Sequence, residues 1–257
     1  LYYLLNRNNK MNLIPFIEIT NQIKDYTSNI TESLKLKEQS IGFIYPISKF
    51  GSISVSFNSV QIGDIPERGY FTKTKLKFDQ IDNLLHPKNG YKLDFIYQNY
   101  EDEDGYDDPT GWTNNIKIDY YKTYNYNHTL RIFSQYKARK AQIAGDYWID
   151  DYRYYGGSNW AVGYEEYTLS GDYLELFGVE YQYHFRNSLT YKLIANYVNK
   201  IKNNDGEQYG PVNYGIGLKI RSFIGPLEFT WGRGHSEPFN KNSKEINIFY
   251  FNFGVAL

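Results

Sequence analysis

The side chains that could carry out chemistry in this sequence are few and widely spaced. The chain has no cysteine, which excludes a thiolate metal site, a cysteine nucleophile and a disulfide scaffold. The histidines show no metal-binding spacing, so we expect no metal and no other cofactor. They are His86, His128, His184 and His235. There is no G-x-S-x-G motif, and we expect neither a catalytic residue nor enzymatic activity in this chain.

One run of carboxylates is dense enough to suggest a calcium site. It is the segment 101–108, EDEDGYDD. Aligning Gly105 with the sixth position of an EF-hand loop puts Tyr100 first and Gly111 twelfth, and neither is a calcium ligand. A solvated external loop therefore explains the run better than a calcium site.

Lys73, Lys75 and Lys77 alternate with uncharged residues along one segment. They could line a path for anions, but pairing with carboxylates on neighbouring strands is the favoured interpretation, because a charge buried alone is costly. The candidate partners are Asp94, Asp119, Glu175 and Glu180, or else the segment 156–164. Over the whole chain 28 basic residues nearly balance 29 acidic ones, so we expect no nucleic-acid partner.

The elements that must position these residues are long alternating strands. Aromatic residues make up 19% of the chain, yet the mean hydropathy is −0.61, so the rings are spread among polar residues. In 177–185, for example, Phe and Tyr alternate with Glu180 and Gln182. The alternating runs last about 9 to 12 residues, as tilted strands that cross a bilayer do. The core of a soluble β-sandwich, the alternative that we considered, would not accept the charges on the second face.

We therefore predict an all-β fold, a transmembrane antiparallel β-barrel formed by residues 1–257 as a single domain. About twelve strands are visible from Asn12 onward, within a range of 12 to 16 for the whole barrel. Residues 1–7 (LYYLLNR) could add one more strand. A long connection over residues 141–172 precedes the last five strands.

Four short motifs, in order over residues 70 to 257, resemble the BamA-like bacterial surface antigen superfamily of outer-membrane assembly and translocation barrels. The segment 156–164 (GGSNWAVGY) is similar to the family loop G-G-x-N-x-[LIV]-R-G-[FY]. The other three are 82–90 (DNLLHPKNG), 214–219 (YGIGLK) and 224–227 (IGPL). The resemblance implies that the loop folds back into the barrel lumen, with the motif positions Gly156, Gly157, Asn159, Val162, Gly163 and Tyr164.

Two departures from the family pattern indicate a particular branch. Val162 replaces the loop arginine, and Asn199 replaces the aspartate that meets this arginine from a strand. Losing both charges together leaves no buried charge unpaired. The resemblance is thus nearest to the barrels of patatin-like (type Vd) autotransporters, with any POTRA or lipase domain outside this chain. The expected C-terminal insertion signal is Phe249, Phe251, Phe253 and Leu257, where the family ends in an aromatic residue.

The resemblance implies an integral protein of the Gram-negative outer membrane that translocates, assembles or anchors protein. Its expected partners are outer-membrane lipid and, during biogenesis, the barrel assembly machinery. A protein client and a second copy of the chain are further partners that the sequence leaves open. The glycines near the last strands are expected to thin the packing at the barrel seam; they are Gly215, Gly217, Gly232 and Gly234. The alternative is a passive pore or surface-binding barrel without a protein client.

Overall fold

The structure is a computed structural model whose regular elements are strands. It describes residues 13–24, 34–62, 68–83, 87–100, 110–142, 161–164, 173–186, 188–203, 206–208, 212–222, 225–235 and 244–253. Within these ranges no helix is long and apolar enough to cross a membrane. The predicted all-β fold class is confirmed.

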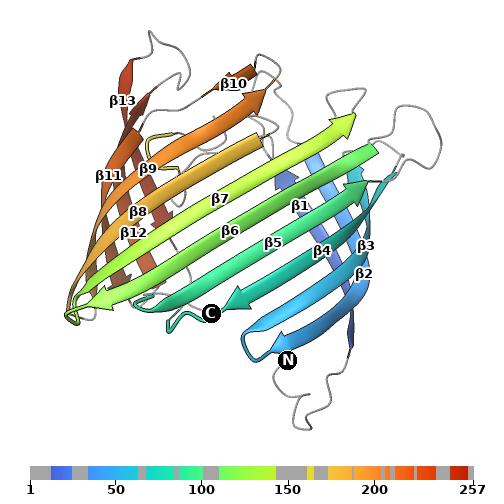
Figure 1. The fold of residues 1–257 in the computed structure, drawn as a ribbon, viewed down its shortest axis with the longest axis horizontal. Coiled ribbons are helices and arrows are strands. Elements are labelled where there is room, and N and C mark those ends of the chain that lie inside the picture. The colour runs from blue at the N-terminus through green and yellow to red at the C-terminus, as the bar shows by residue number, and fades with distance from the viewer. Residues whose placement is uncertain are drawn as a thin grey trace. The chain divides into compact units, whose positions relative to one another are not determined.

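All the strands belong to one sheet in which neighbours along the chain are also neighbours in the sheet (Figure 1). The exception is β10, which pairs with β9 beside the main order, and β1 and β13 stand at the two ends of that order. The strands are β1 (Ile14–Lys24), β2 (Leu34–Ser48), β3 (Gly51–Ile62), β4 (Arg68–Asp79), β5 (Gly90–Tyr100), β6 (Thr110–Tyr124), β7 (His128–Gln142), β8 (Tyr173–Phe185), β9 (Leu189–Asn203), β10 (Gly206–Gln208), β11 (Val212–Ser222), β12 (Gly225–His235) and β13 (Glu245–Phe253).

The predicted strand plan is confirmed, with two differences. The main order contains twelve strands, and the long strands β8, β9, β11, β12 and β13 follow the long connection. The three-residue β10 was not predicted, because so short a strand leaves no alternation to detect. Strand β7 continues to Gln142, so Ala141 lies in a strand and not in the connection. The expected additional strand at 1–7 lies outside the described residues.

Short turns join the strands where the backbone can reverse tightly. Asn125 and Tyr126 join β6 to β7 with φ angles of 48° and 58°, the left-handed values of the mirror-image turns that fit hairpins. This turn was not predicted, since tyrosine is an unusual residue at such a position. Gly90 has a φ of 121°, and a Cβ there would lie 2.1 Å from the carbonyl oxygen of Gln80. Only glycine fits this position, at the end of the predicted 82–90 turn.

Packing divides the chain into two units. Unit 1 comprises Leu1–Phe78, Phe95–Thr113 and Lys140–Trp148, and unit 2 comprises Asp79–Asp94, Asn114–Arg139 and Ile149–Leu257. In each unit one face of the sheet carries the buried polar side chains, and we call it the inner face. The opposite face is called the outer face.

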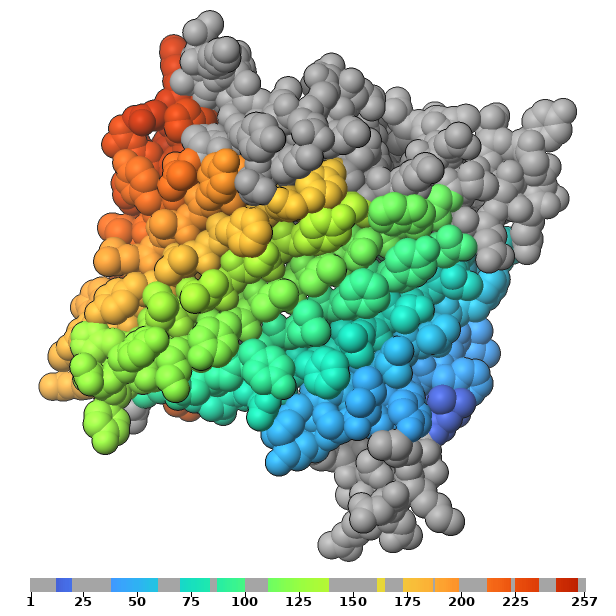
Figure 2. Space-filling view, in the orientation of Figure 1, coloured from blue at the N-terminus to red at the C-terminus, as the bar shows by residue number. Residues whose placement is uncertain are grey.

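Unit 2 buries its polar residues and exposes its apolar ones. On β8, the side chains of Phe177 and Val179 are 50% and 45% exposed. Glu180, which follows Val179 and points to the other face, is 2% exposed. Ring-bearing side chains stand out on strands β6 to β9 in the space-filling view (Figure 2). A protein folded in water would show the reverse pattern. The predicted inside-out arrangement of the two faces is therefore confirmed for this unit.

Unit 1 shows the same inversion. Ile17 and Ile41 are exposed on its outer face, while Ser56 and Asn58 are buried on its inner face and are hydrogen-bonded to each other. On this inner face the ammonium group of Lys73 lies 3.4 Å from a carboxylate oxygen of Glu38. We call Lys73, Lys75 and Lys77 the lysine stripe. Glu38 was not among the partners that we predicted for it. Its partnership depends on how β2, β3 and β4 are staggered, which alternation within one strand does not reveal.

Candidate functional site

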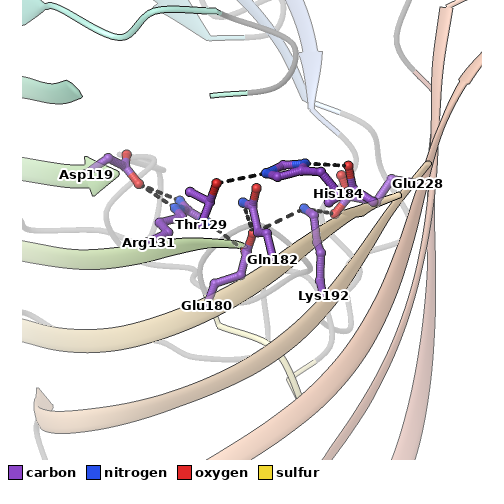
Figure 3. Close-up of polar contacts among 9 residues, drawn as sticks. Asp119, Thr129, Arg131, Glu180, Gln182, His184, Lys192 and Glu228 are labelled. Carbon is purple, nitrogen blue, oxygen red and sulfur yellow. Dashed lines mark hydrogen bonds and ion pairs between the residues drawn. The ribbon is translucent and has the colours of Figure 1, made fainter. Parts of the chain in front are cut away.

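The inner face of unit 2 carries a row of ion pairs that begins at Arg131 on β7. A guanidinium nitrogen of Arg131 lies 2.6 Å from Asp119 Oδ1 on β6. A second nitrogen of the same group lies 3.2 Å from Glu180 Oε2 on β8. Arg131 and Glu180 are direct partners in the pairing of β7 with β8, so the sheet itself sets this contact. The guanidinium therefore bridges two carboxylates on the strands that flank it (Figure 3).

Lys192 on β9 continues the row across the sheet. Its ammonium nitrogen lies 3.6 Å from the second carboxylate oxygen of Glu180 and 2.8 Å from Glu228 Oε1 on β12. Gln182 also donates a hydrogen bond to Glu180. Lys219 on β11 is paired in register with Glu228, which brings a third cation to the row. The row alternates in sign from Asp119 on β6 to Lys192 on β9 (Figure 3). On β11 and β12, Glu228 serves the two neighbouring cations Lys192 and Lys219.

This row, which we call the ionic belt, is buried and balanced. The side chains of Arg131, Glu180 and Lys192 are 12%, 3% and 10% exposed. Three carboxylates, from Asp119, Glu180 and Glu228, face the three cations of Arg131, Lys192 and Lys219. Burying such charges is tolerable only when they are paired and hydrogen-bonded. The belt is suited to hold the wall rigid and polar, since each of its described carboxylates is engaged by a cation.

His184 lies beside the ionic belt in a chain of hydroxyl groups. Its two ring nitrogens lie 2.9 Å from Thr129 Oγ1 and 3.1 Å from Thr190 Oγ1. Thr129 also contacts Thr123, whose hydroxyl donates to the carbonyl oxygen of Lys88 in the 82–90 turn. Both nitrogens of His184 are therefore occupied within the wall (Figure 3). This contact pattern is that of a structural histidine that ties the turn to the sheet.

Residues 161–164 lie on the inner face of β9, β11 and β12. We call them the inner segment. Ala161, Val162 and Tyr164 are each 1% exposed. The carbonyl oxygen of Val162 accepts a hydrogen bond of 3.2 Å from the side-chain amide of Asn196 on β9. Burial raises the pKa of the Tyr164 phenol to about 12, so this ring is neutral near pH 7.

Tyr250 on β13 makes two further hydrogen bonds to the inner segment. The backbone N–H of Gly163 donates to the Tyr250 hydroxyl oxygen over 2.9 Å. The same hydroxyl donates to the carbonyl oxygen of Tyr164 over 2.7 Å. One side chain therefore satisfies both a backbone donor and a backbone acceptor that are buried away from water.

The glycines of β11 and β12 form the seat on which the inner segment lies. A Cβ at Gly215 would lie 2.6 Å from Val162 Cγ1, and one at Gly232 would lie 2.8 Å from the Gly163 nitrogen. A Cβ at Gly234 would lie 1.7 Å from the Gly163 carbonyl oxygen. The expectation that these glycines merely thin the packing is therefore wrong for the three positions. Their missing side chains provide the space that the segment occupies.

An apolar cluster supports the other side of the inner segment. Ala161 and Tyr164 pack with four buried residues from the neighbouring strands, each at most 2% exposed. These are Phe133, Leu174, Leu176 and Val198. The inner face of unit 2 is thus polar at the ionic belt and apolar beneath the segment.

The predicted site residues are placed as follows. Val162, Gly163 and Tyr164 belong to the inner segment, while Gly156, Gly157, Asn159 and Leu257 lie outside the described residues. Asn199 lies in β9, where the register with β8 shifts, but its side chain is also outside the described set. Phe249, Phe251 and Phe253 lie on the outer face of β13 and are 79%, 60% and 48% exposed.

Sequence reasoning missed the residues that hold the segment, namely Asn196 and Tyr250, and the pairings of the ionic belt. Strand parity carried a usable signal for one of them. Phe249, Phe251 and Phe253 alternate along the expected insertion signal and so share one face of the strand, which places Tyr250 on the opposite face. The expected pairing of the lysine stripe with Asp119 and Glu180 is corrected here, since Arg131 and Lys192 hold these two carboxylates.

No family model matches this chain, and no curated protein matches it. Among solved structures it is similar to BamA from Haemophilus ducreyi, crystallised without POTRA domains 1–3, with a TM-score of 0.67. The all-β fold is therefore similar to that of BamA. The match covers 86% of this chain at 8% sequence identity and 55% of the BamA chain, so this chain spans about half the length of its structural relative.

At this level of identity the likeness shows the fold alone. It agrees with the sequence motifs that resemble the BamA-like superfamily, and it does not bear on the autotransporter branch, which stays a prediction.

Proposed function

We propose that this chain is an integral outer-membrane β-barrel that translocates, assembles or anchors protein in a Gram-negative bacterium. The observation that carries the proposal is the BamA-type fold together with the inner segment held on the inner face ahead of the last five long strands. The exposed outer face supports the membrane location. Lipid is the medium in which side chains such as Phe249 and Ile17, 79% and 77% exposed, would be stable.

The proposed mechanism uses the end strands of the sheet. An end strand carries backbone donors and acceptors along the edge that faces away from its neighbour, and these can pair with an added strand. Strands β1 and β13 hold these positions in the order. A client in extended conformation would pair with one of these edges, and the balanced ionic belt would keep the rest of the wall in place while this happens.

A passive pore is the second candidate, and the polar inner face favours it. An inner wall that buries Glu180 and Lys192 is compatible with enclosed water, as in porins. Such a barrel would need no client. The two candidates differ in what the inner segment and its connection do, because a pore must stay open while a client-handling barrel holds its interior occupied.

Single-channel conductance in planar bilayers distinguishes the two candidates. For the client-handling barrel we expect a small, flickering current that grows when residues 151–170 are deleted. Deleting residues 101–108, an acidic run in another connection, is the control and should leave the current unchanged. A steady, large conductance of the intact chain that neither deletion alters would overturn the proposal in favour of the pore.

A further inference from the structure

The hydroxyl of Tyr250 joins two parts of the molecule that are far apart in sequence. It holds the N–H of Gly163 and the carbonyl of Tyr164, while its own backbone belongs to β13. Its ring also lies close over the glycine seat, since a Cβ at Gly232 would come 3.3 Å from Tyr250 Cε2. The inner segment is thus fastened to β13 and not only to the strands beneath it.

Strand β13 is attached to β12 by a backbone ladder and by the contact between the rings of Phe229 and Phe251. Its backbone ladder pairs with β12 from Leu227 opposite Phe253 to His235 opposite Glu245. Its outer side chains are exposed, and the ion pair between Arg233 and Glu245 near one end lies at the surface, where such pairs contribute little. The two hydrogen bonds of Tyr250 add to these contacts and are made to a segment outside the ladder.

We infer that Tyr250 is a positioning residue that acts as a latch, coupling departure of the inner segment to release of β13. While the segment lies on the glycine seat, Tyr250 is held and β13 stays paired with β12. When the segment leaves, β13 loses both hydrogen bonds and opens more often. Under the proposed function, on which this consequence rests, the occupied interior and the edge offered to a client would be regulated together.

The size of the coupling follows from the two hydrogen bonds. Each buried hydrogen bond contributes a modest net stability, and two of them correspond to about a tenfold change in the population of an open β13. Tyr250→Phe removes the hydroxyl and keeps the ring over Gly232. Gly234→Ala acts from the other side, because its Cβ would enter the space of the Gly163 carbonyl. Both variants should release the segment and β13 together.

Hydrogen–deuterium exchange of the full chain, refolded in detergent micelles, measures β13 opening without any client. We expect exchange of the β13 amides to be about tenfold faster in Tyr250→Phe and faster in Gly234→Ala, with β8 and β9 unchanged. The matched control is Tyr191→Phe, whose ring is exposed on the outer face and stacks on Tyr183; its exchange should stay within about twofold of the original chain.

A double substitution tests whether the effect passes through the segment. Gly234→Ala displaces the segment directly, because its Cβ would lie 1.7 Å from the Gly163 carbonyl oxygen. If Tyr250 acts through the segment, adding Gly234→Ala to Tyr250→Phe should speed β13 exchange no further than the stronger single substitution does. Additive effects of the two substitutions would refute the latch, as would unchanged β13 exchange in Tyr250→Phe.

These outcomes are separate from those of the proposed function. If the exchange results hold but the intact chain conducts as a steady pore, the latch stands and the client-handling role fails. If conductance supports the plugged barrel but β13 exchange ignores Tyr250, only the latch fails.

Discussion

Replacing Glu180 by glutamine tests whether the ionic belt stabilises the fold. Glu180 is 2% exposed and lies between Arg131 and Lys192. Glutamine keeps the shape of the side chain and removes its charge. Because the two cations still have Asp119 and Glu228, neither is left wholly without a carboxylate.

The magnitude follows from the contacts that the substitution removes. The hydrogen bond from Arg131 to Glu180 at 3.2 Å is charge-assisted and buried, which corresponds to about 1.5–3 kcal/mol. The contact with Lys192 at 3.6 Å is longer and adds less. Removing one partner of a fully isolated buried pair costs about 3–5 kcal/mol, and the remaining carboxylates should keep the loss below this range. We expect Glu180→Gln to lower the free energy of unfolding by about 2 kcal/mol.

Equilibrium unfolding in urea, with the barrel in lipid vesicles and tryptophan emission as the signal, measures this loss. The matched control is Glu245→Gln, which breaks the ion pair with Arg233 at the surface. The side chain of Arg233 is 42% exposed and that of Glu245 is 55% exposed. That change should leave the free energy of unfolding nearly unchanged, because exposed ion pairs contribute little to stability. The reasoning fails if Glu180→Gln and Glu245→Gln destabilise the protein equally.

Three further predictions concern the faces and ends of the sheet. Leu193→Arg puts a charge on the outer face, where the leucine is 57% exposed, and should lower the free energy of unfolding by about 2–4 kcal/mol if the site lies near the bilayer midplane. Lys192→Arg keeps the charge on the inner face and should lower it by less than about 1 kcal/mol. Urea unfolding in vesicles compares the two variants. Replacing Phe251 and Phe253 together by alanine should reduce the amount of chain in the outer membrane, as fractionation and immunoblotting would show, and normal levels would contradict a role in insertion. An epitope tag inserted in 101–108 should be detected on intact cells, while the same tag in the β6–β7 turn should be detected only after lysis, because long connections face outward and short turns face the periplasm.

The sequence predicted the strands well because each strand carries its own signal. In β8, alternation alone assigned Phe177 and Val179 to one face and Glu180 to the other, and the burial of these residues agrees. A face is a property of one strand and its pleat. The inside-out arrangement could therefore be predicted without knowing how any two strands pair.

Contacts between strands could not be predicted, because they depend on stagger. Arg131 meets Glu180 directly in register, but Lys192 reaches the same carboxylate diagonally, since its register partner is Gln182. Parity is the same for many candidate partners, which is why Asp119 and Glu180 were assigned to Lys73, Lys75 and Lys77 although Arg131 and Lys192 hold them. The glycine seat was missed for a related reason. The sequence of a strand does not show whether the space beside a glycine is empty or is filled by another segment.

The apolar cluster beneath the inner segment has a consequence for any pathway along this wall. With Ala161 and Tyr164 in place, Phe133, Leu174 and Val198 are dry. If the inner segment left the sheet, water would reach these apolar side chains, which lie next to the ionic belt where Arg131 contacts the Phe133 ring. An extended polypeptide in place of the segment could cover the apolar cluster with its own hydrophobic side chains, whereas a hydrated ion could not. Displacing the inner segment would therefore cost less free energy for a polypeptide than for an ion.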